Sequence, residues 1–179
     1  LIATAMCGGN VTLNNVIPGH LEIVIDKLIQ SGTDITIDKN SITIISDKNI
    51  NPVDIITDIY PGYPTDLQAQ WIALMSIANG SSHITDTIYN DRFTHIAELI
   101  RLGAKISMDN NIANITGTSL LSPAEVMSTD IRASASLIIA AMTANGLTKL
   151  SRIYHIDRGY EKIEFKLNKL GADIVRINE

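Results

Sequence analysis

Cysteine and aromatic residues are scarce in this sequence, and each scarcity excludes a class of structure. The single cysteine, Cys7, excludes an internal disulfide and any zinc site built from several cysteines, which is typical of proteins from a reducing compartment. Aromatic residues make up only 4% of the chain, whereas apolar residues make up 45%. The core must therefore consist mainly of Ile, Leu, Val, Ala and Met, and the abundance of isoleucine favours strands.

Long apolar runs and clusters of basic residues are also lacking. Even the apolar stretch 133–142 contains serines and reaches only about half the length of a membrane span. The formal net charge is −5 and the 14 Lys and Arg residues form no run, which argues against a nucleic-acid or membrane surface. The histidines, which show no metal-motif spacing, are His20, His83, His95 and His155. We therefore expect a cytoplasmic protein that binds neither nucleic acid nor membrane.

Three segments of the sequence align on a pair of glycines, which indicates an internal repeat. The paired glycines are 23, 23 and 25 residues apart and are Gly9 and Gly32, Gly80 and Gly103, and Gly146 and Gly171. Each copy predicts a helix, a strand (10–16, 82–89 and 147–153), a second helix and another strand. The first two copies add a further strand, 41–46 and 112–116. The sequence thus predicts one α/β domain over 1–179, with repeats of approximately 1–50, 60–118 and 125–179.

The two kinds of predicted helix differ in their patterns. The second helices are amphipathic and are expected to cover a sheet, with apolar positions Leu21, Val24, Ile25 and Leu28 in the first copy and Ile163, Leu167 and Leu170 in the third. The first helices, "LQAQWIALMSIA" and "IRASASLIIAAM", carry small and apolar residues on most faces, which predicts an interior position. The first and last copies are incomplete, so we expect a helix start and a closing strand to come from elsewhere in a parent chain.

The inner helices of the second and third copies begin with the same motif. Thr65-Asp66 opens one in "YPGYPTDLQAQ", and Thr129-Asp130 opens the other in "STDIRASASL". Thr65 and Gln68 predict a capping box, and an acid in the first turn stabilises a helix in any case. Parallel inner helices would point both acids towards one end of the domain.

Arginines are expected at the same end. Arg92 and Arg158 follow equivalent strands in their copies, and Arg132 follows Asp130 by two residues. Guanidinium groups and unpaired helix amides both favour carboxylate or phosphate, so the sequence predicts an anion-binding mouth. The alternative for Arg158 is a surface pair with Glu161.

The strings "YPGYPTDLQAQ", "NDRFTHIAELIRLGA", "STDIRASASLIIAAM" and "RIYHIDRGYEKIEFKLNKLGA" resemble the UDP-N-acetylglucosamine 1-carboxyvinyltransferases, which are enolpyruvyl transferases. The resemblance covers essentially the whole chain. It implies a two-domain enzyme of inside-out α/β architecture, each domain made of three βαβαββ units around inner helices. This chain would be most of the C-terminal domain, and the N-terminal domain would be its partner.

The resemblance also implies a reaction. Enolpyruvyl is transferred from phosphoenolpyruvate to the 3-hydroxyl of UDP-N-acetylglucosamine and phosphate is released, in the first committed step of peptidoglycan synthesis. No metal or other cofactor is implied. By the same resemblance, Arg92 and Arg132 hold the phosphoenolpyruvate carboxylate, Arg158 lies on its phosphate side, and Ile88 touches the nucleotide sugar through its backbone.

The two acids receive catalytic roles from the resemblance. Asp66 corresponds to the carboxylate that contacts the reacting hydroxyl and is proposed as its base, and Asp130 to a second acid beside the reacting carbon. Neighbouring cations favour an ionised Asp66, so an acceptor that orients the hydroxyl is the alternative to a base. We expect His155 to pack in the site wall and Cys7 to be a buried filler, because the reactive loop cysteine of the family belongs to the other domain.

Several functional segments of the family have no match in this sequence, so we expect the isolated chain to be inactive. Two rival functions stay open. One is an enzyme similar to 5-enolpyruvylshikimate-3-phosphate synthase, with another acceptor; the other is a non-catalytic repeat module similar to a sliding clamp.

Overall fold

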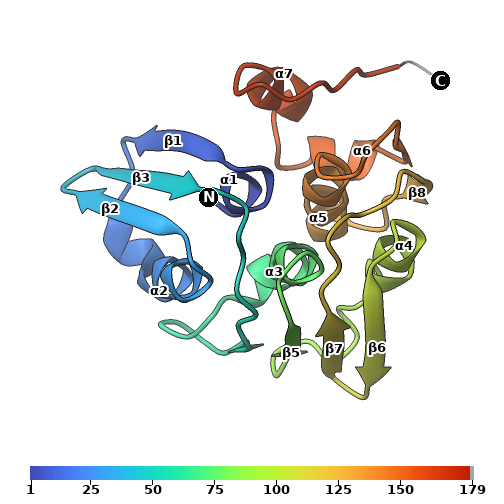
Figure 1. Cartoon of the computed structure of the whole chain (residues 1–179), viewed down its shortest axis with the longest axis horizontal. Helices are drawn as coiled ribbons and strands as arrows, with labels where there is room; N and C mark the ends of the chain where they lie inside the picture. Colours follow the sequence, from blue (N-terminus) through green and yellow to red (C-terminus); the bar gives the residue numbers. More distant parts are fainter. Residues whose placement is uncertain (178–179) are drawn as a thin grey trace.

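Helices lie at the centre of the molecule and small sheets lie around them (Figure 1). The computed structural model describes residues 1–177. Its three sheets have three, four and two strands, and no closed barrel forms among the described residues. This inside-out α/β arrangement confirms the predicted fold class.

The inner helices are α1 (Ile2–Cys7), α3 (Gln68–Met75) and α5 (Ile131–Ala141), and each contacts the other two. Every residue of α3 is buried, which confirms the interior position predicted from its small and apolar residues. The helix has no polar face to turn towards water, so it is stable only when neighbours surround it.

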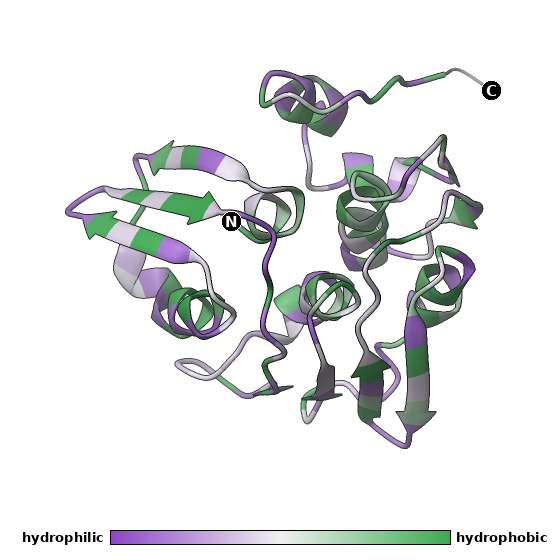
Figure 2. Cartoon of the chain, in the orientation of Figure 1, coloured by the Kyte–Doolittle hydropathy of each residue, from purple (hydrophilic) through white to green (hydrophobic). Residues whose placement is uncertain are grey.

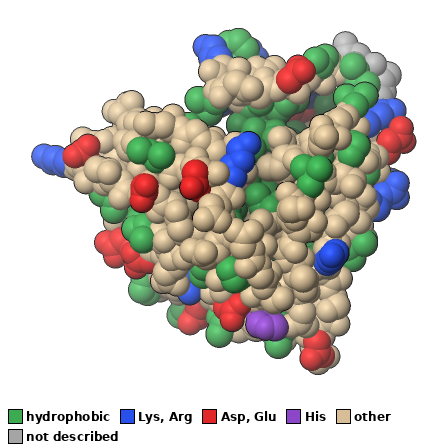
Figure 3. Space-filling model, viewed as in Figure 1, with side chains coloured by type: hydrophobic (Ala, Val, Ile, Leu, Met, Phe, Trp, Pro, Cys, Tyr) green, Lys and Arg blue, Asp and Glu red, His purple; other side chains and the backbone are tan. Residues whose placement is uncertain are grey.

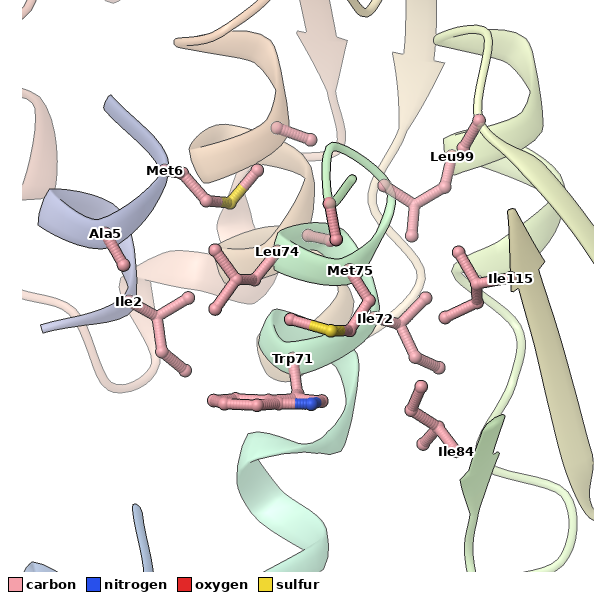
Figure 4. Packing of buried hydrophobic residues seen from close by; sticks show 14 of the residues in the cluster. Ile2, Ala5, Met6, Trp71, Ile72, Leu74, Met75, Ile84, Leu99 and Ile115 are labelled. Carbon is pink, nitrogen blue, oxygen red and sulfur yellow. The ribbon is translucent and has the colours of Figure 1, made fainter. Parts of the chain in front are cut away.

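The main core lies on both sides of α3 (Figure 4). Leu74 points towards Met6 of α1, and Ile72 points towards Ile115 of the second sheet. Trp71 is fully buried and its Nε1 donates to the carbonyl oxygen of Val53 at 3.1 Å, so the polar end of the indole is satisfied. Each such buried side chain stabilises the fold by roughly 1.5–3 kcal/mol relative to exposure.

The first sheet is antiparallel throughout, in the order β1-β3-β2. Its strands are β1 (Gly9–Asn14), β2 (Asp34–Asp38) and β3 (Ser41–Ser46). Along β3, isoleucines are interspersed with paler serine and threonine (Figure 2), and Ile42 and Ile44 are buried. After a short 3₁₀ turn, η1 (Pro18–Leu21), the amphipathic helix α2 (Glu22–Gln30) packs against β2, as predicted.

The second sheet has the order β4-β5-β7-β6 and is the largest. Its strands are β4 (Ile55–Ile56), β5 (Ser81–Thr85), β6 (Lys105–Asp109) and β7 (Ile112–Thr116). Only β4 pairs in parallel with its neighbour β5. Helix α4 (Ile96–Arg101) contacts β6 and buries Ile96 and Leu99, so this sheet is covered by α3 and α4.

The third sheet contains only the parallel pair β8 (Glu125–Met127) and β9 (Lys149–Ser151). The short helices α6 (Tyr154–Asp157) and α7 (Ile163–Asn168) follow, and α7 stands away from the rest of the molecule (Figure 1). The strand predicted after Gly171 is wrong within the described residues, since 172–177 form no regular structure. Among the described residues no neighbouring strand pairs with 172–177, so an extended conformation would give this backbone no strand-to-strand hydrogen bonds.

The covering role predicted for the third amphipathic helix is also wrong. No residue of α7 is buried, and Leu170 is 65% exposed. An amphipathic helix buries its apolar stripe only against a sheet or another helix, and the described residues place neither beneath α7.

The capping box predicted at Thr65 is wrong as well. A 3₁₀ turn, η2 (Thr65–Leu67), precedes α3, and no side chain caps either element. The Thr65 hydroxyl instead donates to the Asp86 carboxylate at 2.7 Å. A stronger, charged acceptor is within reach, so the hydroxyl does not bond the helix amides.

Charged side chains of both signs are scattered over the face shown in Figure 3 without a large basic patch. Within residues 1–177, no helix combines the length and the apolarity needed to cross a bilayer.

Candidate functional site

Asp66 lies at the head of α3, in η2, and its side chain is 65% exposed. One of its oxygens, Oδ1, accepts hydrogen bonds from Arg92 Nη1 at 2.9 Å and from Arg132 Nε at 2.6 Å. These two arginines come from different predicted repeats. Three sequence-predicted site residues therefore meet at a single carboxylate oxygen.

Arg92 follows β5 in a series of turns, and its side chain is only 15% exposed. Besides Asp66, its Nη1 donates to the Thr65 hydroxyl at 3.0 Å. Its guanidinium lies 4.0 Å from the centre of the Tyr89 ring, a favourable cation–π contact. Contacts on several sides fix the direction of this guanidinium.

Asp130 caps α5, because its Oδ1 accepts from the backbone N–H groups of Arg132 at 2.7 Å and Ala133 at 3.1 Å. The second acid is thus placed beside the first through Arg132, which bonds Asp66 with its side chain and Asp130 with its backbone. Thr94 adds a link from the α4 side, since its hydroxyl lies 2.9 Å from that of Thr129.

Arg158 follows α6 and is exposed, and its side chain makes no ion pair within residues 1–177. A Cβ added to the adjacent Gly159 would lie 2.4 Å from Ile131 Cδ1. The backbone beside Arg158 therefore packs against the first residue of α5, next to Asp130. The alternative surface pair is not formed, since Glu161 lies 3.5 Å from Lys166 instead.

Ile88 lies at the surface between β5 and Arg92 and is 38% exposed. Its backbone N–H donates to Asp86 Oδ1 at 3.0 Å. Its carbonyl oxygen accepts no hydrogen bond among residues 1–177.

Four side chains that shape the site were not predicted from the sequence. They are Asp86, Tyr89, His95 and, in its contact with Arg92, Thr65. His95 is 2% exposed at the start of α4, and its Nε2 has no partner among the described residues. Burial lowers its pKa to about 4, and the nearby Asp130 carboxylate opposes this only in part. The imidazole is neutral at pH 7. The available signal in the sequence was a polar residue at position 95, between Phe93 and an apolar helix.

Two further side chains, His155 and Cys7, pack against neighbouring residues. His155 is partly buried and its ring lies 4.3 Å from that of Tyr154, which agrees with packing in a wall. Cys7 is only partly buried, against the core, and burial raises the pKa of its thiol, so it is not activated as a nucleophile.

The arrangement is suited to a small anion. Arg92 uses only Nη1 and Arg132 only Nε in the contacts with Asp66, so other guanidinium N–H groups stay available for a carboxylate. Among the described residues, no three or more His, Cys, Asp or Glu side chains gather closely enough to hold a metal ion.

Comparison with known proteins gives a consistent result. The family model described as EPSP synthase (3-phosphoshikimate 1-carboxyvinyltransferase) matches residues 1–167. A UDP-N-acetylglucosamine 1-carboxyvinyltransferase of Pelodictyon phaeoclathratiforme is 53% identical over 176 residues, which cover 98% of this chain and 42% of that protein. One of Campylobacter fetus is 49% identical over 179 residues, covering 100% and 42%.

Solved structures agree in fold. The enolpyruvyl transferase NikO from Streptomyces tendae matches with a TM-score of 0.87 and 25% identity, over 96% of this chain and 42% of its own. EPSP synthase from Acinetobacter baumannii matches with a TM-score of 0.70 and 14% identity, over 99% and 42%, which bears on the fold alone. The chain spans about 42% of the length of the curated relatives. On the family match and the shared fold, this chain belongs to the EPSP synthase family of enolpyruvyl transferases.

Proposed function

We propose that the protein containing this chain transfers enolpyruvyl from phosphoenolpyruvate to the 3-hydroxyl of UDP-N-acetylglucosamine, with release of phosphate. The observation that carries the proposal is the convergence of Arg92 and Arg132 on Asp66 in a chain about half identical to UDP-N-acetylglucosamine 1-carboxyvinyltransferases. These relatives favour the nucleotide-sugar acceptor over shikimate 3-phosphate. They also favour an enzyme over a clamp-like module.

The chain in this proposal forms most of the C-terminal domain, with the repeats 1–50, 60–118 and 125–179; positions 178 and 179 lie outside the described residues. The N-terminal half of the protein closes the cleft over it. Asp66 is 65% exposed and Arg158 is exposed, so this chain offers one wall of a site and not an enclosed cavity. The wider role is peptidoglycan synthesis in the cytoplasm, and through it cell shape and division.

The arginines bind the three-carbon substrate. The free N–H groups of Arg92 and Arg132 receive the carboxylate of phosphoenolpyruvate, and two guanidinium forks orient this planar group. Arg158 moves in from solvent to the phosphate side, beside the head of α5. Fixed cations stabilise the negative charge of a trianionic substrate and of the phosphate that leaves.

The acids act on the acceptor and the reacting carbon. Asp66 Oδ1 is held by both arginines, while Oδ2 has no hydrogen-bond donor among the described residues and is free to accept from the sugar hydroxyl. Asp66, held by both arginines, orients the hydroxyl oxygen for attack on the carbon of phosphoenolpyruvate that carries the phosphate ester. The new carbon–oxygen bond replaces the one to phosphate, and the hydroxyl proton leaves with the phosphate. Asp130 faces the same space from α5, and the carbonyl oxygen of Ile88 binds the nucleotide sugar.

The test is phosphate release by the full-length protein in the presence of both substrates. Asp66→Asn should lower kcat about 100-fold, the size expected when a reacting group is misplaced by about 1 Å. Asp109→Asn is the matched control, because Asp109 is an exposed acid at the end of β6 and should leave kcat unchanged. Wild-type protein that releases phosphate only with shikimate 3-phosphate as acceptor would refute the proposed substrate.

The isolated chain provides a second test. We expect it to release no phosphate, because residues on the other wall of the cleft are needed for closure. Turnover by the isolated chain at the rate of the full-length protein would contradict the assignment of this chain to one domain of the enzyme.

A further inference from the structure

Asp86 is a fully buried carboxylate beside the site. It follows β5 directly and is 0% exposed. Its backbone is held by Asn111, whose carbonyl oxygen accepts from Asp86 N at 3.0 Å and whose Nδ2 donates to Asp86 O at 3.0 Å. A charge buried at a rigid position is costly unless its oxygens are satisfied.

The Asp86 side chain accepts four hydrogen bonds, and none of the donors is charged. Oδ1 accepts from Thr57 Oγ1 at 2.7 Å, Ile88 N at 3.0 Å and Tyr89 N at 2.9 Å. Oδ2 accepts from Thr65 Oγ1 at 2.7 Å. Both oxygens are thus occupied, and the carboxylate joins the chain around β4, the head of α3 and the turn after β5.

The direction of the bond through Thr65 is fixed by chemistry. A guanidinium has only donors, so the Thr65 hydroxyl must accept from Arg92 Nη1 at 3.0 Å. Its own proton then points to Asp86. Arg92 thus donates to Thr65, and Thr65 donates to Asp86. Because the buried Asp86 carboxylate fixes the Thr65 proton, a lone pair of the Thr65 hydroxyl oxygen stays directed at Arg92.

Asp86 also holds the other side of Arg92. Its bonds to Ile88 N and Tyr89 N shape the turn that places the Tyr89 ring 4.0 Å from the Arg92 guanidinium. The backbone N–H of Arg92 in turn donates to Tyr89 O at 3.1 Å. The buried Asp86 carboxylate therefore positions two contacts of the Arg92 guanidinium, namely the Tyr89 ring against its face and the Thr65 hydroxyl at its Nη1 edge.

We propose that Asp86 is a positioning residue that sets the direction of Arg92 for the substrate carboxylate, acting through Thr65 and the Tyr89 turn. It does not touch the substrate. The proposal rests on the proposed function for the identity of that substrate, phosphoenolpyruvate.

The kinetic test uses four variants of the full-length enzyme. In Asp86→Asn the amide nitrogen is a donor, so either Thr65 or the peptide amides lose their acceptor. Thr65→Val removes only the branch to Arg92, whereas Thr65→Ser keeps the hydroxyl. Thr57→Val is the matched control, because Thr57 also donates to Asp86 but does not contact Arg92.

We expect Asp86→Asn and Thr65→Val to lower kcat/KM for phosphoenolpyruvate by about 100-fold, the size expected when a binding group is displaced by about 1 Å. For Thr65→Val the loss should lie in the KM for phosphoenolpyruvate and spare that for the nucleotide sugar. Thr65→Ser and Thr57→Val should stay within about threefold of wild type. Folded Thr65→Val and Asp86→Asn enzymes with an unchanged KM for phosphoenolpyruvate would overturn the proposal.

A second readout does not depend on the reaction. Hydrogen exchange of the Arg92 guanidinium, followed by NMR of the substrate-free full-length protein, should be slow in wild type and in Thr65→Ser and fast in Thr65→Val and Asp86→Asn. Equal exchange in all of these proteins would refute the positioning role. The expected exchange pattern in a protein that does not consume phosphoenolpyruvate would support positioning and refute the proposed function.

Discussion

Arg92 in the second predicted repeat and Arg158 in the third follow equivalent predicted strands but lie in different surroundings. Arg92 is 15% exposed and is bonded to Asp66 and Thr65. Arg158 is exposed and makes no ion pair within residues 1–177. The Arg92 side chain is thus held by bonds within the chain, whereas the Arg158 side chain is exposed to solvent.

The helices of the two units differ in the same way. Leu102 and Leu170 each precede the second glycine of their repeat, yet Leu102 is 0% exposed and Leu170 is 65% exposed. The second repeat supplies three strands of a four-stranded sheet that its helix covers, and the third supplies two strands. Equal sequence patterns give equal packing only where a partner surface exists.

The largest expected effect comes from the equivalent leucines. Leu102→Ala should lower the free energy of unfolding by about 2–5 kcal/mol, because it leaves a cavity in the core. Leu170→Ala should change it by less than about 0.5 kcal/mol. Urea unfolding of both variants measures this difference, and similar losses for the two would show that α7 packs against the protein in solution.

His95 and Glu161, which each lie three residues after the arginine of their repeat, extend the comparison to pH. The pKa of His95 in the folded state is about 4, below its ordinary 6.5, so the unfolded state binds the proton more tightly. Stability should therefore be full above pH 6.5 and fall as the pH drops towards 4, by on the order of 3 kcal/mol.

Unfolding measured between pH 7 and pH 4 checks this expectation. His95→Gln should remove most of this pH dependence, whereas Glu161→Gln, at an exposed position, should leave stability at pH 7 within about 0.5 kcal/mol of wild type. A wild-type stability that stays constant over this range would mean that His95 is not buried as described.

Substitutions at Arg92 and Arg158 should separate an effect on stability from an effect on activity. Arg92→Gln should cost about 1–2 kcal/mol of stability, since it leaves the Thr65 hydroxyl and the Tyr89 ring without their partner. Arg158→Gln should cost nothing measurable, yet both should impair turnover of the full-length enzyme. Paired unfolding and phosphate-release measurements test this, and a stability loss in Arg158→Gln would end the contrast between the two units.

The smallest effect is expected in the segment 172–177. Arg176 bonds Asp157 at 2.7 Å and Glu164 at 3.0 Å, and these bonds lower the pKa of both acids. Arg176→Gln should therefore cost less than about 1 kcal/mol, because the pairs lie at the surface. Faster amide exchange of 172–177 is the measurement.

Lowering the pH should weaken the Arg176 ion pairs, as Arg176→Gln does. Since the folded-state pKa of each acid is lowered, the contribution of the pairs is present at neutral pH and is lost as the pH falls below about 4. Lys166→Gln, on the same helix, is the control and should leave this exchange unchanged.

Much of the fold was predictable from local patterns. Small and apolar residues on most faces of the stretch around Gln68–Met75 predicted an inner helix, and the glycine spacing predicted the strands of the first two repeats. The motif Thr-Asp at the two helix heads indicated where Asp66 and Asp130 lie. Periodicity carries this information because burial of a face is a property of local sequence.

The partners of Thr65 could not be predicted in the same way. Its sequence context favours a capping box, but Asp86, 21 residues away, takes the hydroxyl instead. The packing of His95 and the role of Asp86 also depend on distant segments, so no window of sequence contains the competing acceptor or the covering residues.

The sequence by itself determined the family, the inside-out order of helices and strands, and which residue types gather at the helix heads, because these follow from periodicity and motif. Tertiary structure alone decided which guanidinium is held and which is free. The hydrogen bonds that make this difference join atoms far apart in the chain, and their strength depends on a burial that only the packed structure creates.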